Sequence, residues 1–345
     1  MEQLLSEKIN LYQDSIKKPL QPVSVNLYIG NLKSLRNKMK VEGEFDNINF
    51  LEDNEKVMSS ISHLSPNTQR NYLNALIVIM YSFDDIFPKI REIYENDRDK
   101  LNILYNDNLT KGILSKKQGE NYLPYEDIVK VYQELFQDIK HTIRKITKNP
   151  ENISISEKRN YQIFVLLSIY LTHPFRNEIV DLETISTKDY SSLTENQKVG
   201  RNLLIIGKEF KYSLNEYKTK KHYKEKLISI DKKEKLILQK WIKLNNISEN
   251  KHLFTTQSTG KKLTRNQLTK IFTNFFKEKV GKSISTTMLT KALDTHEVSL
   301  SPEKIAKLKK LASDRGHSMD TMLNIYVVPP QPNTDKESEV NQKEE

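Results

Sequence analysis

Helical spacing of apolar residues dominates the chain from about Pro22 to Tyr105. Its clearest example, residues 67–83, follows Ser65-Pro66, where serine is a favoured N-cap and proline a favoured first helical residue. One face of this segment is apolar, with Tyr72, Leu76, Ile79 and Met80 at helical intervals, while Gln69, Arg70 and Asn71 can point outward. The pattern predicts a small helical domain over residues 22–105, preceded by an N-terminal segment, residues 1–21.

A polar, irregular stretch, residues 106–121, has the composition of a linker. Beyond it, helical spacing gives way to short apolar strand-like runs and then returns. The predicted helices are Tyr125–Thr147, Glu157–Leu171, Lys232 onward, Leu263–Glu278, Thr286–Asp294 and Pro302–Ser313, and the strand-like runs LLII, FKYSL and KLISI lie between Leu203 and Ile230. The predicted fold class is mainly α with a small antiparallel β-sheet, in which an α+β domain over residues 122–328 follows the helical domain.

Charge is distributed unevenly along the chain. The formal net charge is +10, from 55 Lys and Arg against 45 Asp and Glu. Residues 329–345 are first proline-rich and then acidic, so we expect a disordered acidic tail. The positive charge therefore belongs to the folded part, and a basic surface attracts nucleic-acid phosphates or anionic membranes.

The composition also excludes several classes of protein. With no cysteine there can be no disulfide framework, thiolate nucleophile or Cys-ligated zinc. The longest apolar runs, such as Ile163–Leu171, are far shorter than the roughly 20 residues of a membrane span. The first ten residues, MEQLLSEKIN, lack the apolar stretch of a signal peptide. We expect a soluble intracellular protein without a membrane partner.

The strongest local signal is RGHSMDTMLNIY, in which Gly316-His317-Ser318 precedes Tyr326 by a short helical stretch. A structural interpretation is open, because Met319, Met322, Leu323 and Tyr326 have the spacing of a helical core stripe. The segment also resembles tyrosine recombinases and phage-type integrases. In that family a Gly-His-Ser element is followed, at this spacing, by the tyrosine that attacks DNA.

Further elements resemble the same family in the correct order, over about residues 22–327. SPNTQRNYLNAL, which contains Arg70, is similar to the helical core-binding domain that clamps one side of the DNA duplex. LTHPFRNEIVDLETI resembles the first arginine box and matches its arginine with Arg176 and its following acid with Glu178. Usual phage members place that acid three residues after the arginine, whereas here it follows by two.

The segment LNEYKTKKHYKEKLISID resembles the family's lysine-bearing β-hairpin and matches its catalytic lysine with Lys218. Five lysines in nine residues also suit phosphate binding, and Lys220, Lys221 and Lys224 join Arg70 as candidate DNA contacts. A solvated hairpin tip is the structural alternative.

The second arginine box departs from the family pattern. The family carries His or Lys, two further residues and then Arg, whereas ISTTMLTKAL places Thr287 and Thr290 at the charged positions. Threonine offers one neutral donor where arginine offers paired, charge-assisted hydrogen bonds to phosphate. Lys291, Arg315 and His296 are the candidate substitutes for the missing charge.

The resemblance implies a site-specific recombinase or integrase of a virus or other mobile element. Tyr326 would be the nucleophile that forms a 3′-phosphotyrosyl link, Arg176 and His317 would stabilise the transition state, and Lys218 would protonate the leaving oxygen. It implies no cofactor, whether metal or ATP, and a homo-tetramer assembled on double-stranded DNA. The place of action would be the DNA's own compartment: host cytoplasm, nucleus or viral factory.

Two alternatives accompany this interpretation. The replacement of both charged residues by Thr287 and Thr290 favours a degenerate recombinase that binds DNA without cutting it. A type IB topoisomerase-like enzyme, which nicks and reseals one duplex, ranks lower because residues 22–105 resemble a core-binding domain.

Overall fold

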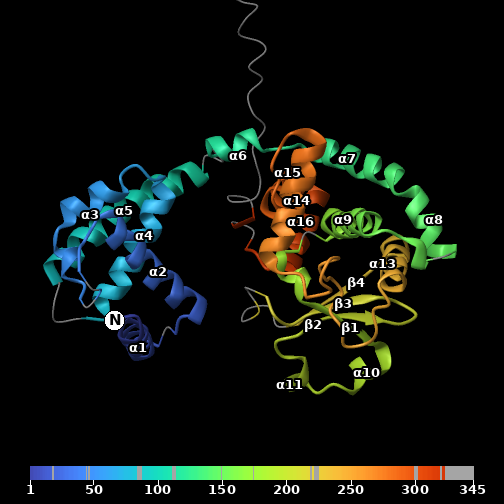
Figure 1. Ribbon diagram of the computed structural model, residues 1–345, viewed down its shortest axis with the longest axis horizontal. Coiled ribbons are helices and arrows are strands. Elements are labelled where there is room, and N and C mark those ends of the chain that lie inside the picture. The colour runs from blue at the N-terminus through green and yellow to red at the C-terminus, as the bar shows by residue number, and fades with distance from the viewer. Residues whose placement is uncertain are drawn as a thin grey trace, which may run out of the picture. The chain divides into compact units, whose positions relative to one another are not determined.

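The structure is a computed structural model that describes residues 1–17, 19–43, 45, 47–83, 88–110, 114–148, 150–173, 175–217, 220, 225–298, 302–318 and 321–322. The chain divides into two compact units, Met1–Lys111 and Gly112–Glu345. Figure 1 draws both units with their elements labelled. The first unit is helical, and the second combines helices with a sheet.

The first unit is built around one central helix. Its elements are α1 (Glu2–Ser15), α2 (Pro22–Lys38), η1 (Asn49–Glu52), α3 (Asn54–Ile61), α4 (Pro66–Tyr81) and α5 (Pro88–Thr110). The predicted start of α4 is confirmed, because the Ser65 side chain accepts a hydrogen bond from the backbone N–H of Thr68. The predicted apolar face is confirmed too, and α4 packs against α1, α2 and α5.

Helix α1 contributes to the same core. Leu5 and Ile9 of α1 are fully buried in it, so the N-terminal segment, residues 1–21, folds together with the helices after it. At another point of this core, the hydroxyl of Tyr94 in α5 donates to the carbonyl of Leu51 at 2.8 Å. A buried hydroxyl needs such a partner, since leaving it unbonded would cost about 1–3 kcal/mol.

The second unit begins with a short helix inside the predicted linker, and two helices then replace the single one predicted over Tyr125–Thr147. Its helical elements are α6 (Lys116–Glu120), α7 (Tyr125–Asp138), α8 (Lys140–Lys148), η2 (Pro150–Asn152), α9 (Ile155–Thr172), η3 (Asn177–Asp181), α10 (Thr187–Ser192), α11 (Glu195–Lys198), α13 (Lys232–Leu244), α14 (Arg265–Val280), α15 (Thr286–Val298) and α16 (Pro302–Arg315). The chain turns at Ile139, between α7 and α8. Ile139 is buried, so this turn keeps its side chain in the core.

The sheet has four strands in the order β1 (Leu182–Ser186), β2 (Asn202–Ile206), β3 (Lys211–Leu214) and β4 (Lys226–Ser229). The three predicted strand-like runs supply β2, β3 and β4, which pair antiparallel. Strand β1 was not predicted and pairs parallel to β2, which makes the sheet mixed rather than antiparallel. A parallel pair needs a crossover connection, and residues 187–201, which include α10 and α11, supply it.

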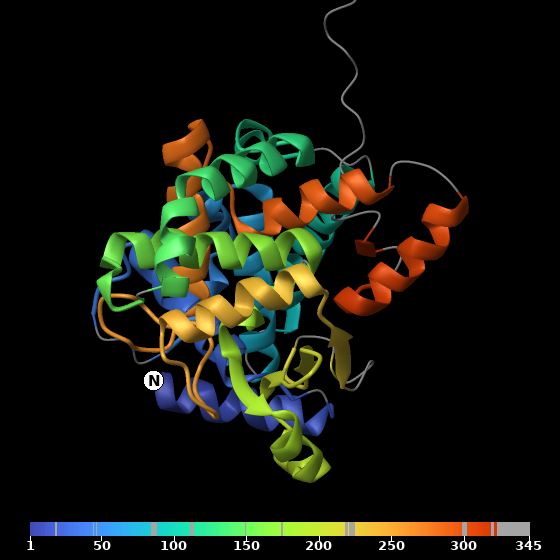
Figure 2. The ribbon, with the colours of Figure 1, turned by 90° about the vertical axis from the view of Figure 1, so that its right-hand side faces the viewer.

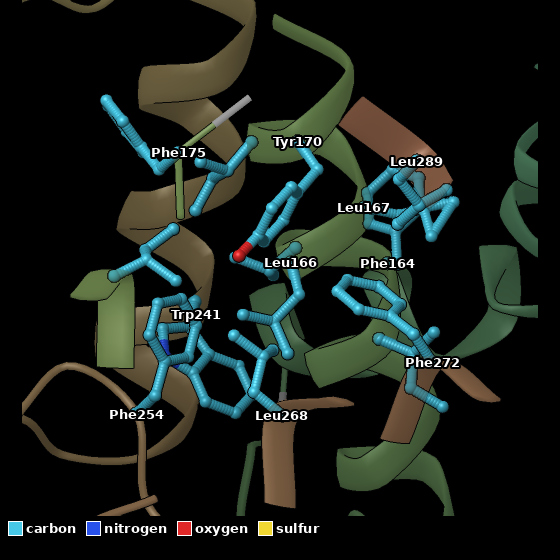
Figure 3. Close-up of a cluster of buried hydrophobic side chains, with 14 of the residues drawn as sticks. Phe164, Leu166, Leu167, Tyr170, Phe175, Trp241, Phe254, Leu268, Phe272 and Leu289 are labelled. Carbon is cyan, nitrogen blue, oxygen red and sulfur yellow. The ribbon is translucent and has the colours of Figure 1, made fainter. Parts of the chain in front are cut away.

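The main core of this unit surrounds α9. Ten consecutive residues of α9, from Tyr161 to Tyr170, are buried, so the helix is covered on all sides. Figure 3 shows its side chains between Trp241 and Phe254 on one side and Leu289 of α15 on the other. The indole N–H of Trp241 donates to the Leu253 carbonyl at 2.8 Å. Both views place the sheet beside the layer formed by α9 and α13 (Figures 1 and 2).

Candidate active site

The first half of the candidate site is Arg176, which comes directly after α9. A capping box formed by Ser154 and Glu157 starts α9, and His173 ends it. Phe175 is buried in the core, and the Tyr170 hydroxyl donates to the carbonyl of Arg176 at 3.2 Å. The backbone of Arg176 is therefore attached to the main core of the unit.

The segment after Arg176 is held from a second side by α14. Arg265 and Lys262 donate to the Asp181 carboxylate at 2.8 and 2.6 Å, respectively. Although burial raises the pKa of Asp181, these hydrogen bonds hold it below its usual value. Asn177 donates to the Thr269 hydroxyl at 3.0 Å, which again links η3 to α14.

Glu178, which the family resemblance matches with the acid of the first arginine box, is buried in η3. Burial raises the pKa of its carboxyl group, while the charges of Arg176 and Arg265 oppose that shift. Glu178, which follows Arg176 by two positions where usual phage members have three, is thus buried in the protein.

The second half of the candidate site is the turn after α16. Gly316 has a φ of 69°, a left-handed conformation that costs little only for glycine. Its N–H donates to the Ser313 carbonyl at 3.1 Å, and the His317 N–H donates to the Ala312 carbonyl at 2.9 Å. This pair of bonds is a Schellman motif. The Gly-His sequence is therefore a helix C-cap that fixes the backbone position of His317 relative to α16.

Ser318 starts the next turn of helix. Its hydroxyl accepts the backbone N–H of Thr321 at 2.9 Å, and its carbonyl accepts that of Met322 at 2.9 Å. All three residues of the Gly-His-Ser element thus have a backbone role, since they end one helix and begin another.

The structure brings Arg176 and His317 together from 141 positions apart. Nη2 of Arg176 lies 2.8 Å from Nδ1 of His317. His317 is buried, with 5% of its surface exposed. A guanidinium can only donate, so Nδ1 accepts this hydrogen bond. Nε2 lies farther from the same Nη2, at 3.5 Å, and a neutral imidazole whose Nδ1 accepts carries its hydrogen on Nε2. The arrangement offers N–H donors from both side chains, which is the chemistry that stabilises an anionic oxygen.

Lys226, the first residue of β4, also reaches this region. Its amine donates to the carbonyls of Ser313 and Asp314 in the last turn of α16. Burial lowers the pKa of Lys226 to about 8; the Asp314 charge raises it and the Arg176 charge lowers it. The sequence did not single out Lys226, because nothing local distinguishes it from the neighbouring lysines.

Most of the predicted lysine cluster is outside the described residues. Lys218, Lys221, Lys224 and Tyr326 are outside the described residues. Lys220 is described, and its amine pairs with Glu216.

Arg70, the candidate DNA contact of the first unit, lies on α4. Its guanidinium stacks over the Tyr105 ring at 3.7 Å and donates to the Asn67 side chain at 2.9 Å. Arg70 thus links α4 to α5, and its charge remains near the surface of this unit.

The residues aligned with the second arginine box lie on α15. Thr287 is exposed, whereas Thr290 is buried and its hydroxyl donates to the Thr286 carbonyl of the same helix at 3.1 Å. The Thr290 hydroxyl is therefore already bonded within its own helix. One turn of α15 thus carries no cation at either aligned position.

The three candidate substitutes have different surroundings. The Lys291 amine is buried, which lowers its pKa, and within the described part of the chain it has no hydrogen bond or ion pair. Arg315 forms a buried ion pair with Asp294, which neutralises its charge. His296 pairs with Glu126 at 2.9 Å and stacks on Tyr125. Lys291 is the one whose charge is not taken up by an acid.

The described residues contain no group of three or more His, Asp or Glu side chains arranged to hold a metal ion. Likewise, no helix in the described part of the chain is long and apolar enough to span a lipid bilayer.

Comparison with solved structures identifies the fold. The chain superposes on the XerH site-specific recombinase bound to its difH substrate in a pre-cleavage complex, with a TM-score of 0.53, 16% identity, and coverage of 93% of this chain and 81% of that one. The post-cleavage XerH complex with a palindromic difH substrate gives 0.53 and 16%, over 91% and 78%. The XerA recombinase gives 0.37 and 11%, over 93% and 91%. The chain has the fold of the XerH recombinase.

The sequence by itself finds no relative: no family model matches it, and no curated protein does. The predicted fold class, mainly helical with a small sheet, is confirmed by the structure and by its likeness to the XerH structure.

Proposed function

We propose that this chain is a site-specific DNA strand transferase of the tyrosine recombinase type. The observation that carries the proposal is the contact between Arg176 and His317, 2.8 Å apart on a fold shared with XerH. The two residues were matched separately with two family motifs, and the fold joins them although 141 positions separate them. The net charge of +10 agrees with a DNA substrate.

In the proposed reaction, the Tyr326 oxygen attacks a phosphorus atom of the DNA backbone. A bond forms between tyrosine and the 3′ phosphate, and the bond to the 5′ oxygen breaks. Tyrosine has an ordinary pKa near 10, so positive charge near the phenol favours loss of its proton. Lys218 would protonate the leaving 5′ oxygen. A second DNA end then attacks the phosphotyrosyl link and releases Tyr326.

Arg176 and His317 would act on the phosphate itself. Negative charge gathers on the non-bridging oxygens in the transition state, and fixed donors stabilise that state more than the ground state. With Nδ1 accepting from Arg176, the Nε2–H of His317 would donate to one such oxygen. This chemistry would need neither metal nor ATP.

The assignment to a virus or other mobile element, and assembly of a tetramer on DNA, are parts of the same proposal. The resemblance motivates both, since recombination must bring two DNA sites together. Lys291 is the favoured substitute for the missing second-box arginine, because Asp294 neutralises Arg315 and Glu126 engages His296.

The test is covalent trapping on nicked suicide duplexes that carry candidate element ends. Wild type should give denaturant-resistant adducts, and Tyr326→Phe should give none while binding DNA normally. Arg176→Ala should lower the cleavage rate by roughly 10²- to 10³-fold with little change in affinity. Arg201→Ala, which removes an arginine paired with Glu183 in the sheet, is the matched control. Adducts that persist in Tyr326→Phe would refute the nucleophile.

One observation favours the second candidate, a recombinase-like protein that binds DNA without cutting it. The hydroxyl of Thr290 bonds to its own helix, so this position supplies no cation. Tight DNA binding without adducts across a fair range of sites would support that function. Plasmid relaxation without recombinant product would instead indicate a topoisomerase-like enzyme.

A further inference from the structure

Lys226 connects two parts of the second unit that are far apart in sequence. Its amine donates to the Ser313 and Asp314 carbonyls, 87 and 88 positions away. These carbonyls belong to the last turn of α16, at the negative end of the helix dipole, and the Ser313 carbonyl also accepts the Gly316 N–H. A protonated amine suits both the carbonyl oxygens and the dipole. Lys226 therefore completes the C-cap that the Gly316 turn begins.

The position of this cap determines where the candidate histidine lies. His317 comes directly after Gly316, and its backbone N–H is bonded into the same last turn of α16. Any shift of that turn relative to β4 therefore moves the imidazole relative to Arg176. The contact at 2.8 Å between Arg176 and His317 leaves little tolerance for such a shift.

Lys226 is itself fixed by the sheet. Strand β4 pairs with β3 from Lys226 to Ser229, with Lys226 opposite Leu214. The amine also lies 5.1 Å from the centre of the Tyr217 ring, a cation–π contact. The lysine thus extends from an ordered strand, beside Tyr217, to the end of α16.

We infer that Lys226 is a positioning residue that holds the Gly316-His317 turn against Arg176. Its effect on DNA cleavage rests on the proposed function, whereas its effect on His317 does not. Lys226 links the lysine-bearing hairpin to the histidine turn, two elements that the family resemblance treats as separate motifs.

The first test needs no DNA. Diethyl pyrocarbonate acylates accessible imidazoles, and trypsin releases His317 in the peptide 316–336 and His296 in the peptide 292–304. Lys226→Met should raise the modification rate of His317 relative to His296 roughly tenfold, the factor that a hydrogen bond from a charged donor contributes. Lys226→Arg, which keeps the charge and the donors, should return the rate to near that of wild type.

Lys235→Met is the matched control, since the Lys235 amine also donates to a backbone carbonyl, that of Lys208, and not to α16. It should leave His317 unchanged. Trp241 is the single tryptophan and is fully buried, so its fluorescence checks that each variant folds. If Lys226→Met does not fold, Lys226→Gln, which keeps one amide donor, should give an intermediate His317 rate.

The second test measures covalent adducts. Lys226→Met should slow their formation by roughly tenfold or more without weakening DNA binding, and Lys226→Arg should restore most of the rate. Unchanged His317 reactivity in Lys226→Met would overturn the inference. So would lost cleavage with unchanged His317 reactivity, because Lys226 would then act on the DNA directly. If wild type forms no adduct, the proposed function fails while the His317 result still decides the role of Lys226.

Discussion

The two halves of the candidate site differ in how much apolar packing attaches them to the protein. Arg176 comes after α9, whose residues from Tyr161 to Tyr170 are all buried, and it is flanked by the buried Phe175 and Ile179. His317 comes after α16, whose described apolar side chains form only a small separate cluster of Ala312 and Leu311 with Met322. Apolar packing around α9 therefore holds the arginine half, and the contacts of Asp181 with Arg265 and Lys262 add to it.

Polar contacts hold the histidine half. Arg315 pairs with Asp294, Lys307 pairs with Glu297 at 2.8 Å, and Lys226 binds the end of α16. The contact between Arg176 and His317 joins the two halves. Polar contacts depend on partner and protonation, whereas apolar packing depends on shape and area. The comparison teaches that charge changes should displace His317 before they displace Arg176.

The largest expected effect comes from Arg315→Met. This change leaves the Asp294 carboxylate, which is fully buried, without its partner, and a broken buried pair costs about 3–5 kcal/mol. Denaturation followed by Trp241 fluorescence measures the loss in the second unit. The double variant Asp294→Leu/Arg315→Met should recover most of it, because no buried charge remains. Lys307→Met, at an exposed pair, should cost below about 1 kcal/mol. A similar cost for both single variants would refute the comparison.

A smaller effect is expected from Gly316→Ala. Alanine at a φ of 69° costs about 1–2 kcal/mol, and relief of that strain would move the His317 turn. Gly200→Ala is the control, since Gly200 has a φ of 79° and an added Cβ there would meet no atom within 4 Å. Both variants should lose similar stability in denaturation, but the Gly316 variant alone should lose adduct formation. Equal adduct yields would show that the turn does not position the histidine.

The smallest effect concerns the arginine half, through the cap of α9. Hydrogen bonds from Lys145 and from the Ser154 backbone lower the pKa of Glu157 to about 2. A lowered carboxyl pKa adds stability above the unfolded value of 4.5, and this stability is lost as pH falls toward 2. Glu157→Ala should cost about 1 kcal/mol at pH 7.

Glu157→Gln keeps the cap but removes the charge, so the difference in unfolding free energy between wild type and this variant should shrink from pH 5 to about pH 2. Trp241 fluorescence during denaturation at each pH measures that difference. A difference that stays constant over this range would mean that the charge of Glu157 adds no stability.

Local sequence patterns predicted the helices better than the sheet. The cap at Ser65 and the apolar face of α4 depend on neighbours within one or two turns, so the sequence alone is sufficient to predict them. Strand β1 was not predicted from local pattern, and its parallel pairing with β2 is made across a crossover. The turn at Ile139 has neither proline nor glycine to mark it, and it results from tertiary packing.

The candidate site divides in the same way. The resemblance singled out Arg176 and His317 from their motifs, and the fold then placed them in contact. Lys226 could not be singled out, since it is one of five lysines in nine residues and only the position of α16 distinguishes it. The pairing of Arg315 with Asp294 was equally invisible, because residues 21 positions apart have no periodic relation.

The contact of Lys226 with α16 has an evolutionary consequence. Its acceptors are backbone carbonyls, and the side chains of Ser313 and Asp314 are exposed. Selection acting on these two hydrogen bonds would constrain residue 226 and leave position 313 free to change, whereas at position 314 only the charge of the aspartate acts on Lys226. Co-variation between aligned sequences would therefore miss the contact between Lys226 and α16. In related chains the contact would be visible only as a lysine at the start of β4 that co-varies with no other position.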